Sequence, residues 1–444
     1  MAPYSTPPPP SRPARHSGPT ASETLHRLFA LEPHPPTAQS LLDHPSARRW
    51  FELLRWGYGE GLYAYQQPLE GRTGPHVRLA GRSMLMLSSD DCLGLVGHPA
   101  IEEAAVAAVR RYGTSSAGAR MLTGTTVLHQ ELERDLAAFK GVDAALTLGS
   151  GYVANLAVVA ALLGPRDRVL LDARTRHSWR DACTLARVPV RTLRHADPDA
   201  LRQELARGRR GAGARTVIVV EGLSGMDGDI SPLPELIAVK QEFGAFLVVD
   251  ETYSLGVLGA EGRGVDQHFG LPTAGVDAWT GSLAKAIPAN GGFIAGSREL
   301  IVYLQHTVSR AWFSTALCPA AVAAAGAALR VLHREPERLA RMRRNAASLR
   351  TGLRALGCDT GRSASAIIPV MVGDDEAAWR LARALFDHDV VASAVVSPVV
   401  RRGEARLRLC VSAGHSERDL AQALDAFAAV RGATEPCVGA RETS

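Results

Sequence analysis

The stretch from residue 101 to residue 330 alternates helical patterns with short apolar runs, and this rhythm constrains the fold more than any other feature of the sequence. The runs are AALTLGS, RVLLD, TVIVVEG, FLVVDE, AWTGS and GGFIAG. Short apolar runs separated by amphipathic helices are typical of a mostly parallel sheet, because parallel neighbours need a long crossover connection. We therefore predict a large α/β domain over 101–330, with ligands beyond the carboxyl ends of its strands.

The rest of the chain divides by composition. Residues 1–45 are rich in Pro, Ser and His, and we expect a disordered tail there. Residues 46–100 form an N-terminal segment, in which VRLAGRSMLMLSS predicts a hairpin or strand pair. Residues 331–434 mix apolar runs with helical patterns and predict a smaller α+β C-terminal domain, followed by a tail at 435–444.

Composition and charge exclude several classes of protein. No apolar run approaches the roughly 18 residues that a membrane helix needs, and the start lacks the apolar stretch of a signal peptide, so we expect a cytoplasmic location. The six cysteines are scattered without a CxxC pair or a His cluster, which argues against disulfides and metal. A net charge of +5 without a basic, aromatic-rich run does not indicate nucleic-acid binding, but it favours an anionic substrate such as an acyl thioester.

Lysine is rare in this chain. Only three of the 50 Lys and Arg residues are lysines, so generic surface charge is carried by arginine. Lys140 and Lys240 lie in amphipathic helical stretches, where we expect exposed surface positions. Lys285 lies among small residues, and lysine offers what arginine does not, an amine that can lose its proton.

Two neighbouring motifs give Lys285 a chemical context. The run FLVVDETYSLGVLGAEGRG places Asp250 at the carboxyl end of a strand, and DAWTGSLAKAIPAN places Lys285 three residues after Ser282. Pyridoxal phosphate (PLP) needs a carboxylate against its pyridine nitrogen, a hydroxyl for its phosphate and an amine for its aldehyde. An acid after a strand is by itself more often a cap or turn residue, so the combination carries the prediction.

Eight motifs in consistent order extend this pattern from about residue 60 to 431. They are GPHVRLAGRSMLMLSSDDCLGLVGHP, YGTSSAGARMLTGTTVLHQELE, SGYVAN, EGLSGMDGD, DETYSLGVLGAEGRG, SLAK, FSTAL and RLRLCVSAGHS. With this set the chain resembles the α-oxoamine synthase family. The resemblance implies a PLP-dependent transferase of fold type I that forms a homodimer with shared active sites.

The resemblance also implies roles for individual residues. Lys285 resembles the Schiff-base lysine, Asp250 the partner of the pyridinium nitrogen, and Arg408 the arginine that holds the amino-acid carboxylate, a task suited to a bidentate donor. For Arg408 alone, a surface position on a strand is the default expectation.

The phosphate site is carried over in the same way. Ser150, Gly151 and Tyr152 resemble a loop whose backbone amides hold the phosphate at a helix N-terminus. Ser282 matches a phosphate-binding hydroxyl. Thr315 in FSTAL matches a residue that reaches the cofactor of the neighbouring subunit.

Four positions depart from the family pattern close to the reacting groups. Asp90 replaces an asparagine that contacts the substrate carboxylate, so it either turns toward a cation or meets a different substrate group. Tyr253 replaces a histidine beside the phenolic oxygen of the cofactor, and Gly225 replaces a serine. Arg176 matches the ring-stacking histidine, with His177 one residue further on, and either side chain is able to stack.

The leading interpretation is a condensation in which an amino acid attacks an acyl thioester, on CoA or on a carrier protein, with loss of CO2 to give an α-amino ketone. Asp90 and Tyr253 keep a second interpretation open, a PLP enzyme of altered chemistry such as an aminotransferase or a condensation without decarboxylation. A catalytically silent partner subunit and a binding module without PLP are the remaining alternatives, and the retained Lys285 argues against the silent subunit.

Overall fold

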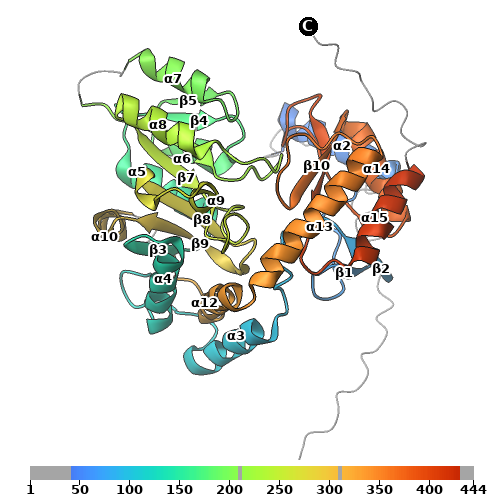
Figure 1. Cartoon of the computed structure of the whole chain (residues 1–444), viewed down its shortest axis with the longest axis horizontal. Coiled ribbons are helices and arrows are strands. Elements are labelled where there is room, and N and C mark those ends of the chain that lie inside the picture. The colour runs from blue at the N-terminus through green and yellow to red at the C-terminus, as the bar shows by residue number, and fades with distance from the viewer. Residues whose placement is uncertain (1–41, 209–212, 309–312, 431–444) are drawn as a thin grey trace, which may run out of the picture.

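The computed structural model describes residues 42–208, 213–308 and 313–430. The tails predicted for 1–45 and 435–444 lie outside the described residues, except for 42–45. Figure 1 shows two bodies, a large domain built around one wide sheet and a smaller one that contains both the first and the last described elements.

The large domain contains a seven-stranded sheet in the order β3-β9-β8-β7-β6-β4-β5. Strand β9 is antiparallel to β8 and β3, and every other neighbouring pair is parallel. The predicted α/β domain is therefore confirmed. The strands are β3 (Ala144–Leu148), β4 (Arg168–Asp172), β5 (Val190–Leu193), β6 (Thr216–Glu221), β7 (Phe246–Asp250), β8 (Ala278–Ala284) and β9 (Pro288–Gly296).

Helices cover both faces of this sheet, which explains why its central strands are almost continuously apolar. Strand β6 is buried at each of its six positions. One face packs on α5, α6 and α10, and the other on α4, α7, α8 and α12. The helices of this domain are α3 (Pro99–Tyr112), α4 (Val127–Lys140), α5 (Gly151–Leu162), α6 (His177–Leu185), α7 (Pro198–Ala206), α8 (Leu233–Phe243), α9 (Val265–Phe269), α10 (Arg298–Thr307) and α12 (Pro319–Arg334).

The small domain combines the C-terminal third of the chain with the N-terminal segment. The predicted hairpin is present as β1 and β2, and β11 pairs with β2 in parallel, so residues from both ends share one core. A second sheet has the order β10-β13-β12. The elements are α2 (Pro45–Gly59), β1 (His76–Leu79), β2 (Arg82–Met86), α13 (Pro336–Ala355), β10 (Ile367–Gly373), α14 (Asp375–Asp387), β11 (Val390–Val391), β12 (Ser393–Val395), β13 (Ala405–Cys410) and α15 (Glu417–Val430).

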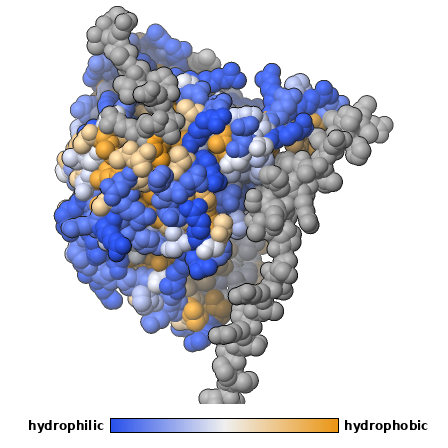
Figure 2. All heavy atoms as spheres, turned by 90° about the vertical axis from the view of Figure 1, so that its right-hand side faces the viewer, coloured by the Kyte–Doolittle hydropathy of each residue, from blue (hydrophilic) through white to orange (hydrophobic). Residues whose placement is uncertain are grey.

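The outer face of the small domain is largely hydrophilic, with a patch of apolar residues on its upper part (Figure 2). Within the described ranges, none of the helices is both long and apolar enough to cross a membrane.

The expectation that Lys140 and Lys240 are exposed is wrong. The Lys140 side chain is 1% exposed, and its Nζ donates to Glu251 at 2.7 Å and also pairs with Asp266. Lys240 is 13% exposed and forms an ion pair with Asp277 at 2.7 Å. Both lysines extend from the inner faces of their helices toward acids contributed by later segments, which helical periodicity alone does not reveal.

Candidate active site

The carboxyl ends of β7 and β8 bring the two predicted anchor residues to one edge of the sheet. Asp250 is the last residue of β7, and Lys285 directly follows β8, which pairs with β7 in parallel. Lys285 and Tyr253 line a small cavity that also receives side chains from the small domain, including Asp90 and Cys410. The cavity therefore lies beyond the strand ends, as expected for an open α/β sheet.

Asp250 is surrounded by hydrogen-bond donors. Its buried carboxylate accepts from Asn155 Nδ2 at 2.9 Å, from Trp179 Nε1 at 3.2 Å and from the Thr252 amide at 3.0 Å. Arg176 Nε lies 3.4 Å away. Each of these neighbours carries N–H groups, so together they hold the carboxylate in place at the end of the strand.

Of the adjacent residues Arg176 and His177, the first contacts the site and the second lies at the surface. Arg176 Nε donates to Glu221 at 3.0 Å, and its guanidinium lies 5.1 Å from the centroid of the Tyr253 ring. Burial opposes its charge, but Glu221 and Asp250 outweigh burial and raise the pKa of Arg176. His177 is exposed at the first position of α6. The structure thus brings Arg176, and not His177, against the residues of the site.

Asp90 turns toward cations, one of the two outcomes expected for it. Its carboxylate forms ion pairs with Lys285 and, at 2.9 Å, with Arg408, whose side chain is only 11% exposed. Burial would raise the pKa of Asp90, but Arg408 and Lys285 outweigh burial and lower that pKa. Burial disfavours the Lys285 ammonium, yet Tyr253 and Asp90 raise its pKa. Asp90 therefore neutralises the arginine expected to receive a substrate carboxylate.

Tyr253 forms the centre of a group of three cations. Its ring centroid lies 5.1 Å from the Arg408 guanidinium, 5.2 Å from Lys285 Nζ and 5.1 Å from Arg176. The ring also occupies the space above Gly225, because a Cβ built on Gly225 would lie 2.2 Å from Tyr253 Cε2. The two departures from the family pattern are thus one steric unit, in which the missing side chain at 225 accommodates the larger ring at 253.

The predicted phosphate loop lies at the start of α5. Ser150 caps this helix by accepting from the Val153 amide at 3.2 Å, and Gly151 begins the helix beside Ser282. A Cβ on Gly151 would lie 3.1 Å from the Ser282 Cβ, so a larger residue at 151 would crowd Ser282. The Tyr152 side chain is exposed, and its hydroxyl bonds to Asp181. A helix N-terminus beside a hydroxyl is a suitable site for a phosphate.

Thr315 does not join the site within this chain. It is exposed, and its segment pairs with Ala119 of a neighbouring loop. Two large apolar side chains are also strongly exposed. Phe313, close to Thr315 in sequence, is 89% exposed, and Leu122, close to Ala119, is 73% exposed.

Sequence reasoning missed three residues that hold the site together. Asn155 and Trp179 contact Asp250, and Glu221 pairs with Arg176. Asn155 lies in the motif SGYVAN, one helical turn after Gly151, which is the signal that could have directed attention to it. Trp179 lies in α6 and Glu221 is the last residue of β6, and only the assembled sheet places them beside Asp250.

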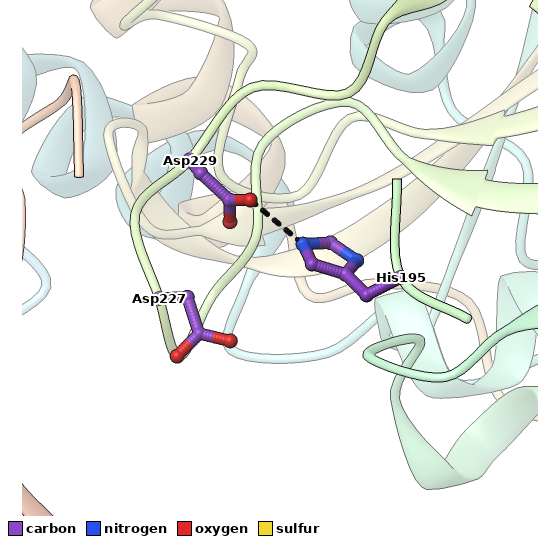
Figure 3. A group of neighbouring side chains, drawn as sticks. All are labelled: His195, Asp227 and Asp229. Atoms are coloured by element: carbon purple, nitrogen blue, oxygen red, sulfur yellow. Dashed lines mark hydrogen bonds and ion pairs between the residues drawn. The ribbon is translucent and has the colours of Figure 1, made fainter. Parts of the chain in front are cut away.

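A histidine between acids lies near the same edge of the sheet. His195, Asp227 and Asp229 have possible ligand atoms within 4.8 Å of one another, and Figure 3 shows the contact between His195 and Asp229. His195 bonds to Asp172 through Nδ1 at 2.7 Å and to Asp229 through Nε2 at 2.8 Å. A protonated imidazole donates through both nitrogens and has no lone pair for a metal. The contacts therefore describe an ion-paired histidine.

We expect this histidine to make stability dependent on pH. Burial opposes its charge, but the hydrogen bonds to Asp172 and Asp229 outweigh burial and raise the pKa of His195 to about 10. Because the folded pKa exceeds the unfolded value, the stabilisation is complete below about pH 6.5 and is lost as pH rises through about 10. At about 1.4 kcal/mol per pKa unit, the loss amounts to a few kcal/mol.

Urea unfolding at about pH 7 and pH 10.5 measures this loss, and His195→Gln should reduce the difference between the two conditions. His333→Gln, at an exposed position, serves as the control. An equal pH dependence in the His195→Gln protein would contradict the assignment.

Comparisons with known proteins identify the family. The model for aminotransferase class I and II matches residues 82–427. The 8-amino-7-oxononanoate synthase of Geobacter sulfurreducens is 40% identical over 374 residues, which cover 84% of this chain and 95% of the relative. The enzyme of that name from Symbiobacterium thermophilum is 38% identical over 370 residues, covering 83% and 94%.

Solved structures agree with this similarity. Serine palmitoyltransferase from S. paucimobilis, with bound PLP, has a TM-score of 0.84 and 29% identity over 89% of this chain and 99% of that one. The Sphingomonas wittichii serine palmitoyltransferase has a TM-score of 0.83 and 30% identity, covering 89% and 98%. The chain therefore belongs to the aminotransferase class I and II family and, within it, to the α-oxoamine synthases, which are PLP-dependent enzymes of fold type I.

Proposed function

We propose that this protein condenses an amino acid with an acyl thioester, with loss of CO2, to give an α-amino ketone. The observation that carries the proposal is the place of Lys285. It lines the cavity beside the strand that ends in the donor-surrounded Asp250, and it shares the ion-pair partner Asp90 with Arg408. The named relatives support the same reaction class. PLP, when bound, supplies an electron sink that stabilises negative charge on the α-carbon of the substrate.

The position of each site residue indicates its role in the proposed reaction. Asp250 would face the ring nitrogen of the cofactor, and the first turn of α5 with Ser282 would hold its phosphate. Lys285 would attach the aldehyde and, once freed by the substrate amine, move a proton at the α-carbon. Arg408 would bind the substrate carboxylate through its planar guanidinium.

A second candidate function is a PLP enzyme of altered chemistry, either an aminotransferase or a condensing enzyme that retains the carboxylate. The pairing of Asp90 with Arg408 favours this candidate, because the usual carboxylate-binding cation is already neutralised.

Two measurements test the proposed function. Borohydride reduction of the PLP-loaded protein followed by peptide mapping should place the pyridoxyl group on Lys285. Incubation with an amino acid and an acyl thioester should release CO2 in proportion to the ketone formed. A pyridoxyl group on Lys140 or Lys240 would contradict the lysine assignment, and turnover to a keto acid without CO2 would instead favour the aminotransferase.

Asp90 should determine which amino acids bind. In the present arrangement a substrate carboxylate competes with Asp90 for Arg408, and two carboxylates about 4 Å apart repel by roughly 4 kcal/mol at an effective dielectric of 20. We therefore expect Asp90→Asn to bind small amino acids such as glycine, alanine or serine at least about tenfold more tightly. Dissociation constants read from the cofactor absorbance check this, and identical profiles in both proteins would place Asp90 outside the substrate pocket.

We also propose a homodimer with shared sites. The exposed Thr315 lies in the same segment as the exposed Phe313, and the neighbouring loop contains the exposed Leu122. Burial of such side chains by a second copy would bring Thr315 toward the cofactor phosphate of the partner.

A further inference from the structure

The carboxylate of Asp90 contacts two cations of the candidate site at the same time. Its Oδ2 accepts from Lys285 Nζ, and its Oδ1 accepts from Arg408 Nη2 at 2.9 Å. The three residues come from separate segments of the chain, after β2, after β8 and within β13. The carboxylate therefore forms a bridge between the lysine expected to hold the cofactor and the arginine expected to hold the substrate.

This bridge is largely shielded from water. The side chains of Asp90 and Lys285 are 26% and 24% exposed. The apolar residues that line the same cavity are Leu223, Val257, Ala286, Ala366 and Ile367. Solvent screens a partly buried ion pair much less than an exposed one, so the charge of Asp90 acts strongly on Lys285.

Few other groups that carry or gain a charge face Lys285. Tyr253 presents its ring 5.2 Å from Lys285 Nζ, and Cys92 and Cys410 line the same cavity. Burial raises the pKa of both thiols, that of Cys410 to about 11, so neither carries a charge near neutral pH. Within the described ranges, Asp90 is the one carboxylate that forms an ion pair with Lys285.

These neighbours act on the charge of Lys285 in opposite directions. Burial, together with Arg408, disfavours the ammonium, but Tyr253 and Asp90 outweigh this effect and raise the pKa of Lys285. Without the charge of Asp90, burial and Arg408 would have less to oppose them. An asparagine at position 90 has no such charge, so this effect belongs to the aspartate.

We propose that Asp90 keeps the nitrogen of Lys285 protonated, both as the free ammonium and as the nitrogen that joins Lys285 to PLP. Asp90 is then a positioning residue that acts through Lys285, in addition to its effect on substrate choice. Protonation of the joining nitrogen makes the attached carbon more reactive toward the amine of a substrate. The inference rests on the proposed function for the attachment of PLP to Lys285, and it does not require that condensation follows.

A pH titration of the PLP-loaded, full-length protein without substrate tests the proposal. The protonated and the neutral forms of the joining nitrogen differ in absorbance, so the titration gives a midpoint without any turnover. An opposite charge in contact shifts a pKa by about 1–3 units, and we expect Asp90→Asn to lower the midpoint by that amount. An unchanged midpoint would overturn the proposal.

Asp389→Asn is the matched control. Asp389 forms an ion pair with Arg82 at 2.6 Å in the small domain and does not line the cavity. Its φ of +60° is one that asparagine tolerates, so the same change from acid to amide is made without backbone strain. The midpoint of this variant should equal that of the wild type, and a fall as large as in Asp90→Asn would contradict a specific role for Asp90.

Two further variants test the sign of the effect. Arg408→Gln removes a cation that opposes the charge of Lys285 and leaves Asp90 with Lys285 alone, so its midpoint should be no lower than in the wild type. Tyr253→Phe keeps the ring and removes the hydroxyl. A fall in Arg408→Gln would show a general disturbance of the site, and a fall in Tyr253→Phe as large as in Asp90→Asn would assign the effect to the phenol. Either result would overturn the proposal.

The rarity of lysine permits a second measurement, which does not depend on cofactor binding by the Asp90→Asn protein. The chain has three lysines, so reductive methylation of the cofactor-free protein with isotope-labelled formaldehyde gives few NMR signals, and Lys285→Arg identifies the relevant one. The Lys285 signal should titrate about 1–3 pH units lower in Asp90→Asn than in the wild type, with the Lys240 signal unchanged. Equal midpoints for Lys285 would reject the proposal.

These outcomes are separable from those of the proposed reaction. A lowered midpoint in Asp90→Asn without any release of CO2 from the wild type would support the role of Asp90 while the condensation fails. Release of CO2 with equal midpoints in both proteins would sustain the condensation and reject this role for Asp90.

Discussion

Replacing Asp250 with asparagine should slow α-proton exchange of a bound amino acid by roughly a thousandfold. An opposite buried charge shifts the pKa of its partner by up to about 3 units, and each unit changes the protonated population tenfold. Without the carboxylate, the pyridine nitrogen would be largely unprotonated and would withdraw fewer electrons. Exchange of the α-proton with deuterated solvent, followed by NMR, measures this step without the acyl donor.

The Asp250→Asn protein should still fold. Its amide oxygen can accept from Asn155 and Trp179, while its amino group faces the Thr252 amide, at a cost of about 1–3 kcal/mol. Asp277→Asn is a matched control, because Asp277 precedes β8 at the opposite edge of the sheet and accepts from the Leu247 amide at 2.7 Å. Near-normal exchange in Asp250→Asn, or an equal loss in the control, would argue against its role beside the ring nitrogen.

Gly225→Ser should disturb the site through a steric clash with Tyr253, because glycine has no side chain whose function could be lost. A Cβ at this position would lie 2.2 Å from Cε2 and 2.7 Å from Cδ2 of Tyr253, so the ring must move. Overpacking of this kind costs about 1–3 kcal/mol. Because the Tyr253 ring lies against Arg176 and Arg408, its displacement should also shift the absorbance of the bound cofactor.

The double variant Gly225→Ser/Tyr253→His provides the sharper test. The imidazole is smaller than the phenol, so the two changes together should be less harmful than Gly225→Ser alone, with a coupling free energy of about 1 kcal/mol or more. Gly164→Ser is the control, because a Cβ there meets nothing within 4 Å. Strict additivity in unfolding free energy and in cofactor absorbance would mean that the two positions are independent.

The sequence predicted the parts of this molecule that local pattern determines. Alternating apolar runs revealed the large sheet, because buried parallel strands are continuously apolar whatever their neighbours are. Asp250 and Lys285 were identifiable because each lies at a strand end, where chemistry and not packing selects the residue type.

The residues that escaped prediction are those whose surroundings come from distant segments. In the sequence Lys140 lies in an ordinary amphipathic helix, and only the folded chain brings Glu251 and Asp266 next to it. The charge of Asp90 indicated either a neighbouring cation or a different substrate group, and its contact with Lys285 depends on how the N-terminal segment docks on the large domain.

The pairing of β2 with β11 delays completion of the small domain during synthesis of the chain. Leu85 lies opposite Val390, so about 300 residues must be made before the first of these strands meets its partner. At roughly 5–20 residues per second, the ribosome leaves the N-terminal segment without its final neighbour for about 15–60 s. Leu85 and Leu87 are almost completely buried in the finished protein, but during that interval they lack the segments that will bury them. The part of the chain that is made first therefore depends on the part made last to escape aggregation.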